Sequence, residues 1–157
     1  MAQYMKRTDN PYLFWSGMVL VLGALVHLAT IFGGPDWYAY IGAPDGIVAM
    51  ARAGKRYPVV VCLIIASLLF VCAAFAFSGA GLIWRLPLLR TVLALMAGGL
   101  LVRGISFIPL IVWRPEILAA VTSIHSVNTL LLITSAICLG TGLGLALGLR
   151  QLMKSSA

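Results

Sequence analysis

The chain has 157 residues, of which 62% are hydrophobic and only 10% are charged, and its mean hydropathy is +1.05. An average soluble domain is roughly 25% charged, so this composition excludes an ordinary soluble protein and predicts an integral membrane protein. The net charge of +7 comes with no dense basic run, which argues against a nucleic-acid partner. We expect the basic residues at the ends of the apolar runs to orient the chain and to meet anionic lipid head groups.

The first apolar run predicts a membrane-spanning helix over residues 12–32. Asn10 is a favourable N-cap, and Pro11 fits the first helical position, where a missing N–H costs nothing. The sequence Gly33-Gly34-Pro35 predicts the end of this helix. The run is too long for a secretory signal, and no small-residue cleavage site follows it, so we expect it to be retained.

The connection over residues 35–56 is the longest in the sequence and predicts a short interfacial segment. Pro44-Asp45 favours a helix that continues to Ala53 and stops at Gly54. Aromatic residues of the kind that lie at head-group level precede this helix: Trp37, Tyr38 and Tyr40. We expect the segment to lie on the membrane surface or to cap the bundle, because it is too short to span a bilayer.

Three further apolar runs predict spans over residues 57–77, 87–112 and 117–149. A spanning helix needs about 20 apolar residues, so the four runs account for most of the sequence. The predicted fold is therefore an all-α membrane protein: a four-transmembrane-helix bundle with the interfacial segment between its first two helices. It would form a single integral domain over residues 1–157.

The distribution of Lys and Arg indicates how this bundle is oriented. With the N-terminus inside, six basic residues fall on the cytoplasmic side: Lys6, Arg7, Arg85, Arg90, Arg150 and Lys154. Four fall on the other side, where three acidic residues offset them: Arg52, Lys55, Arg56 and Arg114, with Asp36, Asp45 and Glu116. We therefore expect a multi-pass protein of the bacterial inner (cytoplasmic) membrane with both termini in the cytoplasm.

The third predicted span contains a charged residue, Arg103. A charge at the centre of a bilayer costs at least about 2.5–3.5 kcal/mol, so it normally faces protein, water or a ligand. At a rise of about 1.5 Å per residue, Arg103, His27 and His125 are all expected in the outer half of the membrane. His125 shares a helical face with Asn128. The connection adds three residues to this candidate ligand-binding set: Asp36, Trp37 and Tyr38.

Three interpretations of this set are open. The first is a structural polar network, in which Arg103 pairs with a loop carboxylate or with Asn128. The second is a binding site for a lipid, quinone or other amphiphile, and the third is a proton-carrying or redox site. In a redox site, His27 and His125 would be the axial ligands of a haem in a four-helix bundle. Two histidines are too few for a zinc site and no cysteine pair forms a CxxC motif, so no metal site is predicted.

Small residues recur at every fourth position near the end of the fourth span. They form a small-xxx-small ridge of Ala136, Gly140, Gly144 and Gly148. Such a ridge lets the backbones of two helices approach closely. The ridge predicts helix packing within the bundle or dimerisation through the fourth span, and the sequence leaves both open.

Three stretches of the sequence carry a resemblance: LVHLATIFGGPDWYAYIGAP (25–44), SGAGLIWRLPLLR (78–90) and LLVRGI (100–105). They resemble a group of small four-span inner-membrane proteins of proteobacteria, which have no assigned activity. The connection in the first stretch is also loosely similar to that of DoxX-like membrane proteins, some of which are associated with quinone-linked oxidation. The resemblance implies four helices and identifies no catalytic residue.

Together these features predict a non-catalytic inner-membrane protein, an accessory or interaction component that binds a lipid or quinone in its outer half. Its expected partners are membrane lipids and either another protein or a second copy of the chain, bound through the fourth span. One alternative is a membrane enzyme or redox protein that uses His27, Arg103 and His125, with haem or quinone as cofactor. Another is a transporter of a small anion, which at this chain length would require an oligomer.

Overall fold

The computed structural model describes residues 10–113 and 129–155, and over these residues the chain forms six helices and no strand. By length and composition, four of the helices can cross a membrane. They are α1 (Pro11–Gly33), α4 (Tyr57–Gly79), α5 (Leu89–Trp113) and α7 (Thr129–Lys154). The predicted all-α fold with four apolar helices is confirmed.

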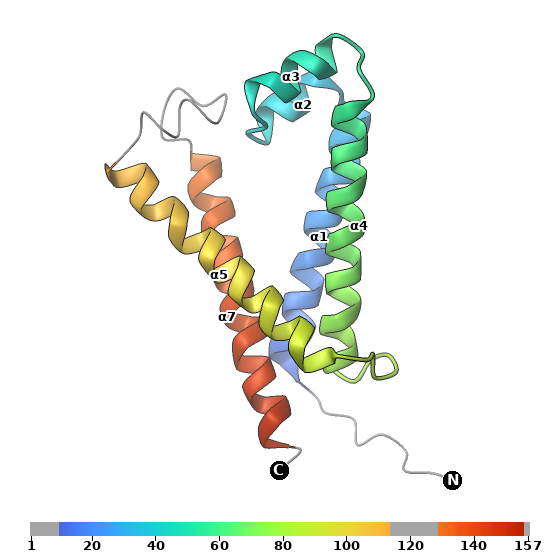
Figure 1. Ribbon diagram of the computed structural model, residues 1–157, viewed down its shortest axis with the longest axis vertical. Coiled ribbons are helices and arrows are strands. Elements are labelled where there is room, and N and C mark those ends of the chain that lie inside the picture. Colours follow the sequence, from blue (N-terminus) through green and yellow to red (C-terminus); the bar gives the residue numbers. More distant parts are fainter. Residues whose placement is uncertain (1–9, 114–128, 156–157) are drawn as a thin grey trace.

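The four long helices form two antiparallel pairs (Figure 1). Helix α1 packs along α4, and α5 packs along α7. The pairs meet where the described chain begins and ends, which we call the terminal end, and they diverge toward the opposite half (Figure 1). We call that opposite half the α2–α3 half, because the two short helices lie at its tip.

The main hydrophobic core lies at the terminal end, where all four long helices contribute to it. Leu13 of α1, Leu93 of α5 and Leu145 of α7 have no exposed surface. The cluster also includes Ala76 at the end of α4. Gly79 lies among these side chains, since a Cβ at this position would be 2.5 Å from Cδ1 of Leu13. Convergence of the helices therefore depends on small residues as well as on leucine.

Asn10 begins α1 as the sequence predicts, and it also joins α1 to α7. The backbone N–H of Leu13 donates to Oδ1 of Asn10 at 3.2 Å, which satisfies an N–H group that the helix leaves unpaired. Nδ2 of Asn10 donates to the carbonyl oxygen of Gly148 on α7 at 2.8 Å. The side chain is 2% exposed, so both hydrogen bonds are shielded from water.

Helices α5 and α7 approach each other through two glycines. A Cβ on Gly142 of α7 would lie 3.0 Å from Cγ of Leu101, and a Cβ on Gly104 of α5 would collide with the side chain of Leu139. Each glycine thus receives a leucine of the partner helix. This mutual arrangement explains the close α5–α7 pair and fixes which face of α5 is turned toward α7.

The connection between α1 and α4 contains two short helices, α2 (Pro35–Tyr40) and α3 (Asp45–Arg52). The sequence predicts α3 but not α2. Gly34 has a φ of +72°, which ends α1, and Pro35 then occupies the first position of α2. The Gly-Pro pair is therefore both a helix stop and a helix start, since Pro suits the first turn.

Helix α7 ends at Lys154, five residues beyond the predicted end of the fourth span. Leu152 is 5% exposed and belongs to the terminal core, so its burial holds the last turn in the helix. The predicted start of this span near residue 117 lies outside the described residues.

Candidate functional site

Arg103 is an exposed residue in the second half of α5. The next residue, Gly104, faces Leu139 of α7. Consecutive residues of a helix point about 100° apart, so Arg103 emerges beside the α5–α7 contact rather than within it. Of the other exposed residues at this level of α5, Val102 and Ile105 are apolar and Ser106 is polar.

His27 lies on the other helix pair, in the second half of α1. Its Nδ1 is 2.9 Å from the carbonyl oxygen of Gly23, one turn earlier in the same helix. A carbonyl oxygen only accepts, so Nδ1 carries the proton in this bond and Nε2 is the acceptor in the neutral ring. The ring is half-buried, and Nε2 is the atom that would meet a ligand or receive a proton.

The three candidate residues of α2 have very different surroundings. Asp36 is 92% exposed, and its Oδ1 lies 3.7 Å from Nη2 of Arg52 on α3, which makes a surface ion pair of small energetic value. Trp37 is half-exposed and packs against the backbone of Gly33. Tyr38 is buried, and removal from water raises the pKa of its hydroxyl, with the nearby Cys62 thiol as a second cause.

The structure brings only some of the candidate residues together. Within the described ranges, no Cα atom of α5 lies within 8 Å of a Cα atom of α1, α2 or α3, so Arg103 lies on one helix pair and His27 on the other. Tyr38 belongs to a small core with Val48 of α3 and Cys62 of α4, which fixes α2 and α3 on the ends of α1 and α4. The predicted proximity of Arg103 to His125 and Asn128 lies outside the described residues, as does Glu116.

The small-residue ridge of α7 contacts α1 along only part of its length, because the two helix pairs diverge. A Cβ on Gly148 would lie 2.5 Å from Cγ of Leu13, and one on Gly144 would lie 2.5 Å from Oγ of Ser16, so these glycines adjoin α1. By contrast, a Cβ on Gly140 would meet nothing within 4 Å, and Ala136 is exposed. The ridge therefore packs within the bundle near the terminal end and is open farther along the helix.

A groove of about 360 Å³ lies where the ridge becomes open, between α1 and α7. Its walls are mostly apolar and include two aromatic side chains: Pro11, Tyr12, Trp15, Ser16, Val19, Gly140, Thr141 and Gly144. Trp15 is 66% exposed. The sequence does not predict this groove, because the groove depends on the distance between α1 and α7 in the fold. The sequence signal for it is limited to two aromatic residues, Tyr12 and Trp15, near the predicted start of the first span.

Metal chemistry has no visible support in the described part of the chain. Within residues 10–113 and 129–155, no group of three or more His, Cys, Asp or Glu residues is arranged to hold a metal ion. Cys62, Cys72 and Cys138 form no disulfide. A haem held by His27 would need His125, which lies outside the described residues, so that alternative stays a prediction.

Comparison of the chain with protein-family models, with curated proteins and with solved structures found no match. No family, relative or solved structure therefore indicates a function for this chain.

Proposed function

We propose that this chain is a non-catalytic protein of the bacterial inner membrane that binds a lipid or quinone between the α2–α3 halves of its two helix pairs. It would serve as an accessory component of a larger membrane system. The observation that carries the proposal is the divergence of the α1–α4 pair from the α5–α7 pair (Figure 1). In this half, apolar side chains of α1 and α7 are exposed, and the exposed Arg103 lies on α5.

The chemistry of these faces suits an amphiphile. Leu22 and Val26 of α1, and Ile133 and Ile137 of α7, are exposed in this half, and they would contact acyl or isoprenoid chains by dispersion. Arg103 would meet the polar end of the ligand, because a guanidinium donates strong hydrogen bonds to carbonyl and phosphate oxygens. A ligand that carries both groups would match the combination of a guanidinium with apolar side chains in this half.

The proposal is tested by native mass spectrometry of the full chain purified in a mild detergent. We expect a lipid or quinone to be retained by the unaltered protein and to be lost from Arg103→Gln. A hydrogen bond to a charged group is worth about 1.5–3 kcal/mol, so retention should fall by about tenfold or more. Arg56→Gln, which removes an exposed arginine near the start of α4, is the matched control and should retain the ligand.

Two results would contradict the proposal. One is a protein that carries no lipid or quinone at any detergent concentration at which it remains folded. The other is an Arg103→Gln variant that keeps its ligand but unfolds at a lower temperature, which would make Arg103 part of a structural network.

A further inference from the structure

A second cavity lies at the terminal end, far from the proposed ligand region, where the link between α4 and α5 meets the end of α7. Its volume is about 350 Å³. Two arginines and a threonine share its wall with four leucines: Arg85, Arg90, Thr91, Leu86, Leu88, Leu89 and Leu152. The cavity thus combines cationic and apolar surface.

The backbone beside Arg85 is held in place by a buried hydroxyl group. Ser78, in the last turn of α4, is 3% exposed. Its Oγ donates to the carbonyl oxygen of Trp84 at 2.8 Å and accepts from the N–H of Leu86 at 2.9 Å. Because these two hydrogen bonds fix the residues on either side of Arg85, the position of that arginine in the link is determined by the fold.

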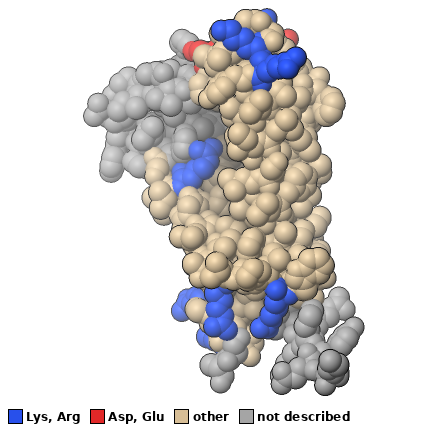
Figure 2. Space-filling view, turned by 45° about the vertical axis from the view of Figure 1, so that its right-hand side comes forward, with Lys and Arg blue, Asp and Glu red and all other residues tan. Residues whose placement is uncertain are grey.

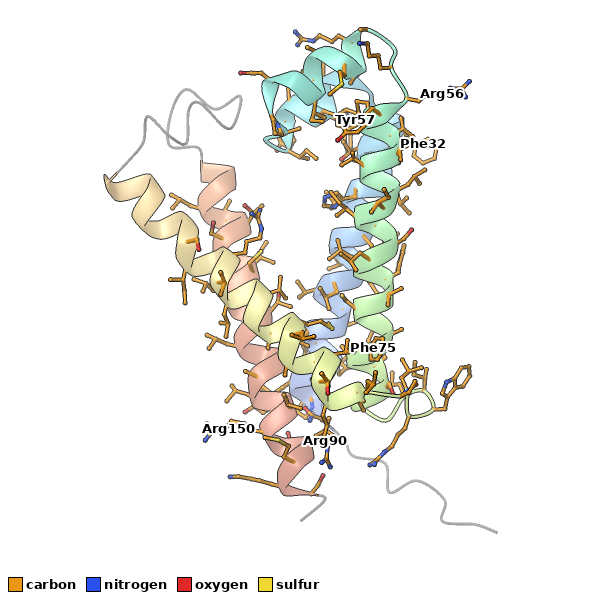
Figure 3. The ribbon with its side chains drawn as sticks, viewed as in Figure 1. Phe32, Arg56, Tyr57, Phe75, Arg90 and Arg150 are labelled. Carbon is orange, nitrogen blue, oxygen red and sulfur yellow. The ribbon has the colours of Figure 1, made fainter. Side chains whose placement is uncertain are left out.

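The charge around this cavity is uniformly positive among the described residues. Arg85, Arg90, Arg150 and Lys154 lie at the terminal end, and the described acidic residues, Asp36 and Asp45, lie on α2 and α3 at the opposite end. On the face that Figure 2 shows, basic side chains of the described residues lie at both ends and at one place between them, and acidic ones lie at the α2–α3 tip. Figure 3 shows Arg90 and Arg150 at the terminal end.

We expect the cavity to lie near the level of the membrane phosphate groups, because it adjoins the ends of two helices that are long enough to span a bilayer. Trp84, which precedes Arg85, and Leu88, three residues after it, are 73% and 75% exposed. Tryptophan is typical of the boundary between acyl chains and head groups. Helix α4 ends and helix α5 begins beside the cavity, so the cavity lies near the ends of these helices rather than midway along them.

We propose that Arg85 and Arg90 bind the phosphate of an anionic phospholipid in the leaflet at the terminal end, while the leucines of the cavity contact the upper part of its acyl chains. Arginine is suited to this role because its planar guanidinium donates two parallel hydrogen bonds to a phosphate. A leucine-lined wall next to a pair of arginines favours a phosphate that is attached to a lipid over inorganic phosphate. The site shares no residue with the proposed region around Arg103, so either proposal can fail alone.

The test compares two double variants of the full chain in mild detergent, titrated with phosphatidylglycerol or with zwitterionic phosphatidylcholine. Native mass spectrometry should show that the unaltered protein binds phosphatidylglycerol in preference. Each arginine near a membrane surface contributes about 1 kcal/mol toward an anionic lipid, so Arg85→Gln with Arg90→Gln should weaken this binding by about tenfold or more. Arg150→Gln with Lys154→Gln removes the same charge from the same end, outside the cavity wall, and should weaken it much less.

Three outcomes would overturn the proposal. The first is that the unaltered protein shows no preference for phosphatidylglycerol over phosphatidylcholine. Equal losses in the two double variants would mean that the positive charge acts diffusely and that no site exists at Arg85 and Arg90. Retention of inorganic phosphate without retention of phosphatidylglycerol would exclude the lipid as the source of the phosphate. If the glutamine variant does not fold, Arg85→Lys with Arg90→Lys keeps the charge, and it should still bind phosphatidylglycerol more weakly than the unaltered chain.

Discussion

The terminal end and the α2–α3 half of this bundle contain the same four helices but pack them differently. At the terminal end, leucines from α1, α5 and α7 are fully buried in one core, and Asn10 links α1 to α7 by a hydrogen bond. In the α2–α3 half, each helix packs mainly on its pair partner, and large apolar side chains such as Leu22 and Ile133 remain exposed. The same chain thus forms one closely packed end and one open half.

The physics of membranes explains why the two regions differ. Lipid chains solvate leucine as well as a protein does, so large apolar residues alone do not draw two helices together. Close approach requires small residues and interhelical hydrogen bonds. The terminal end has both, in Gly79, Gly148 and Asn10, and α7 adds Gly144 beside Ser16 of α1. The open half of α7 also has a small residue, Gly140, but α1 does not approach it.

If stability resides at the terminal end, truncating its core should have the largest effect on unfolding. We expect Leu13→Ala to lower the free energy of unfolding by about 2 kcal/mol, the low end for a buried leucine, because lipid and not water is the alternative surroundings. Leu22→Ala, in the same helix but exposed, should change it by less than about 0.5 kcal/mol. Unfolding in mild detergent by added sodium dodecyl sulfate, followed by circular dichroism, measures both. Equal losses would remove the distinction between the two regions.

Much of this architecture could be predicted from the sequence because it depends on composition along the chain. Four apolar runs predict four spans, and Asn10-Pro11 predicts the first residue of α1 correctly. The second short helix of the connection was not predicted, because Gly34-Pro35 was interpreted only as a stop. The extension of α7 to Lys154 was also not predicted, since it depends on the burial of Leu152 against residues distant in sequence.

The candidate site could be predicted only in part. Sequence places Arg103 within a span, and the structure shows it exposed on α5. Sequence could not show that His27 lies on a different helix pair, because pairing and divergence are tertiary features. Neither the groove beside Trp15 nor the cavity between Arg85 and Arg90 has a linear motif. Each is formed by elements that meet only in the fold.

Asn10 offers a sharper test of how the terminal end is joined, since its two hydrogen bonds have separable roles. Asn10→Ala removes both bonds and should cost about 1.5 kcal/mol, from about 1 for the helix cap and about 0.6 for the interhelical bond. Asn10→Ser keeps an oxygen that accepts from the N–H of Leu13 but has no amide donor for Gly148, so its cost should be smaller. The same unfolding assay ranks the two variants. A Ser variant as unstable as the Ala variant would show that the interhelical bond dominates.

The smallest expected effect on the free energy of unfolding comes from a glycine-to-alanine substitution, which we compare at two positions of the α7 ridge. Gly148→Ala places a methyl group against Leu13, whose buried side chain cannot move away, and overpacking of this kind costs about 1–3 kcal/mol. The gain in helix propensity, about 0.8–1 kcal/mol, offsets part of this, so we expect a net loss of about 1 kcal/mol. Gly140→Ala meets no atom within 4 Å and should be neutral or slightly stabilising. Because lipid chains can adapt to an added methyl group, a loss at Gly140 as large as that at Gly148 would mean that another protein surface covers the open half. Cross-linking of a cysteine placed at that position would then distinguish a second copy of the chain from a different partner.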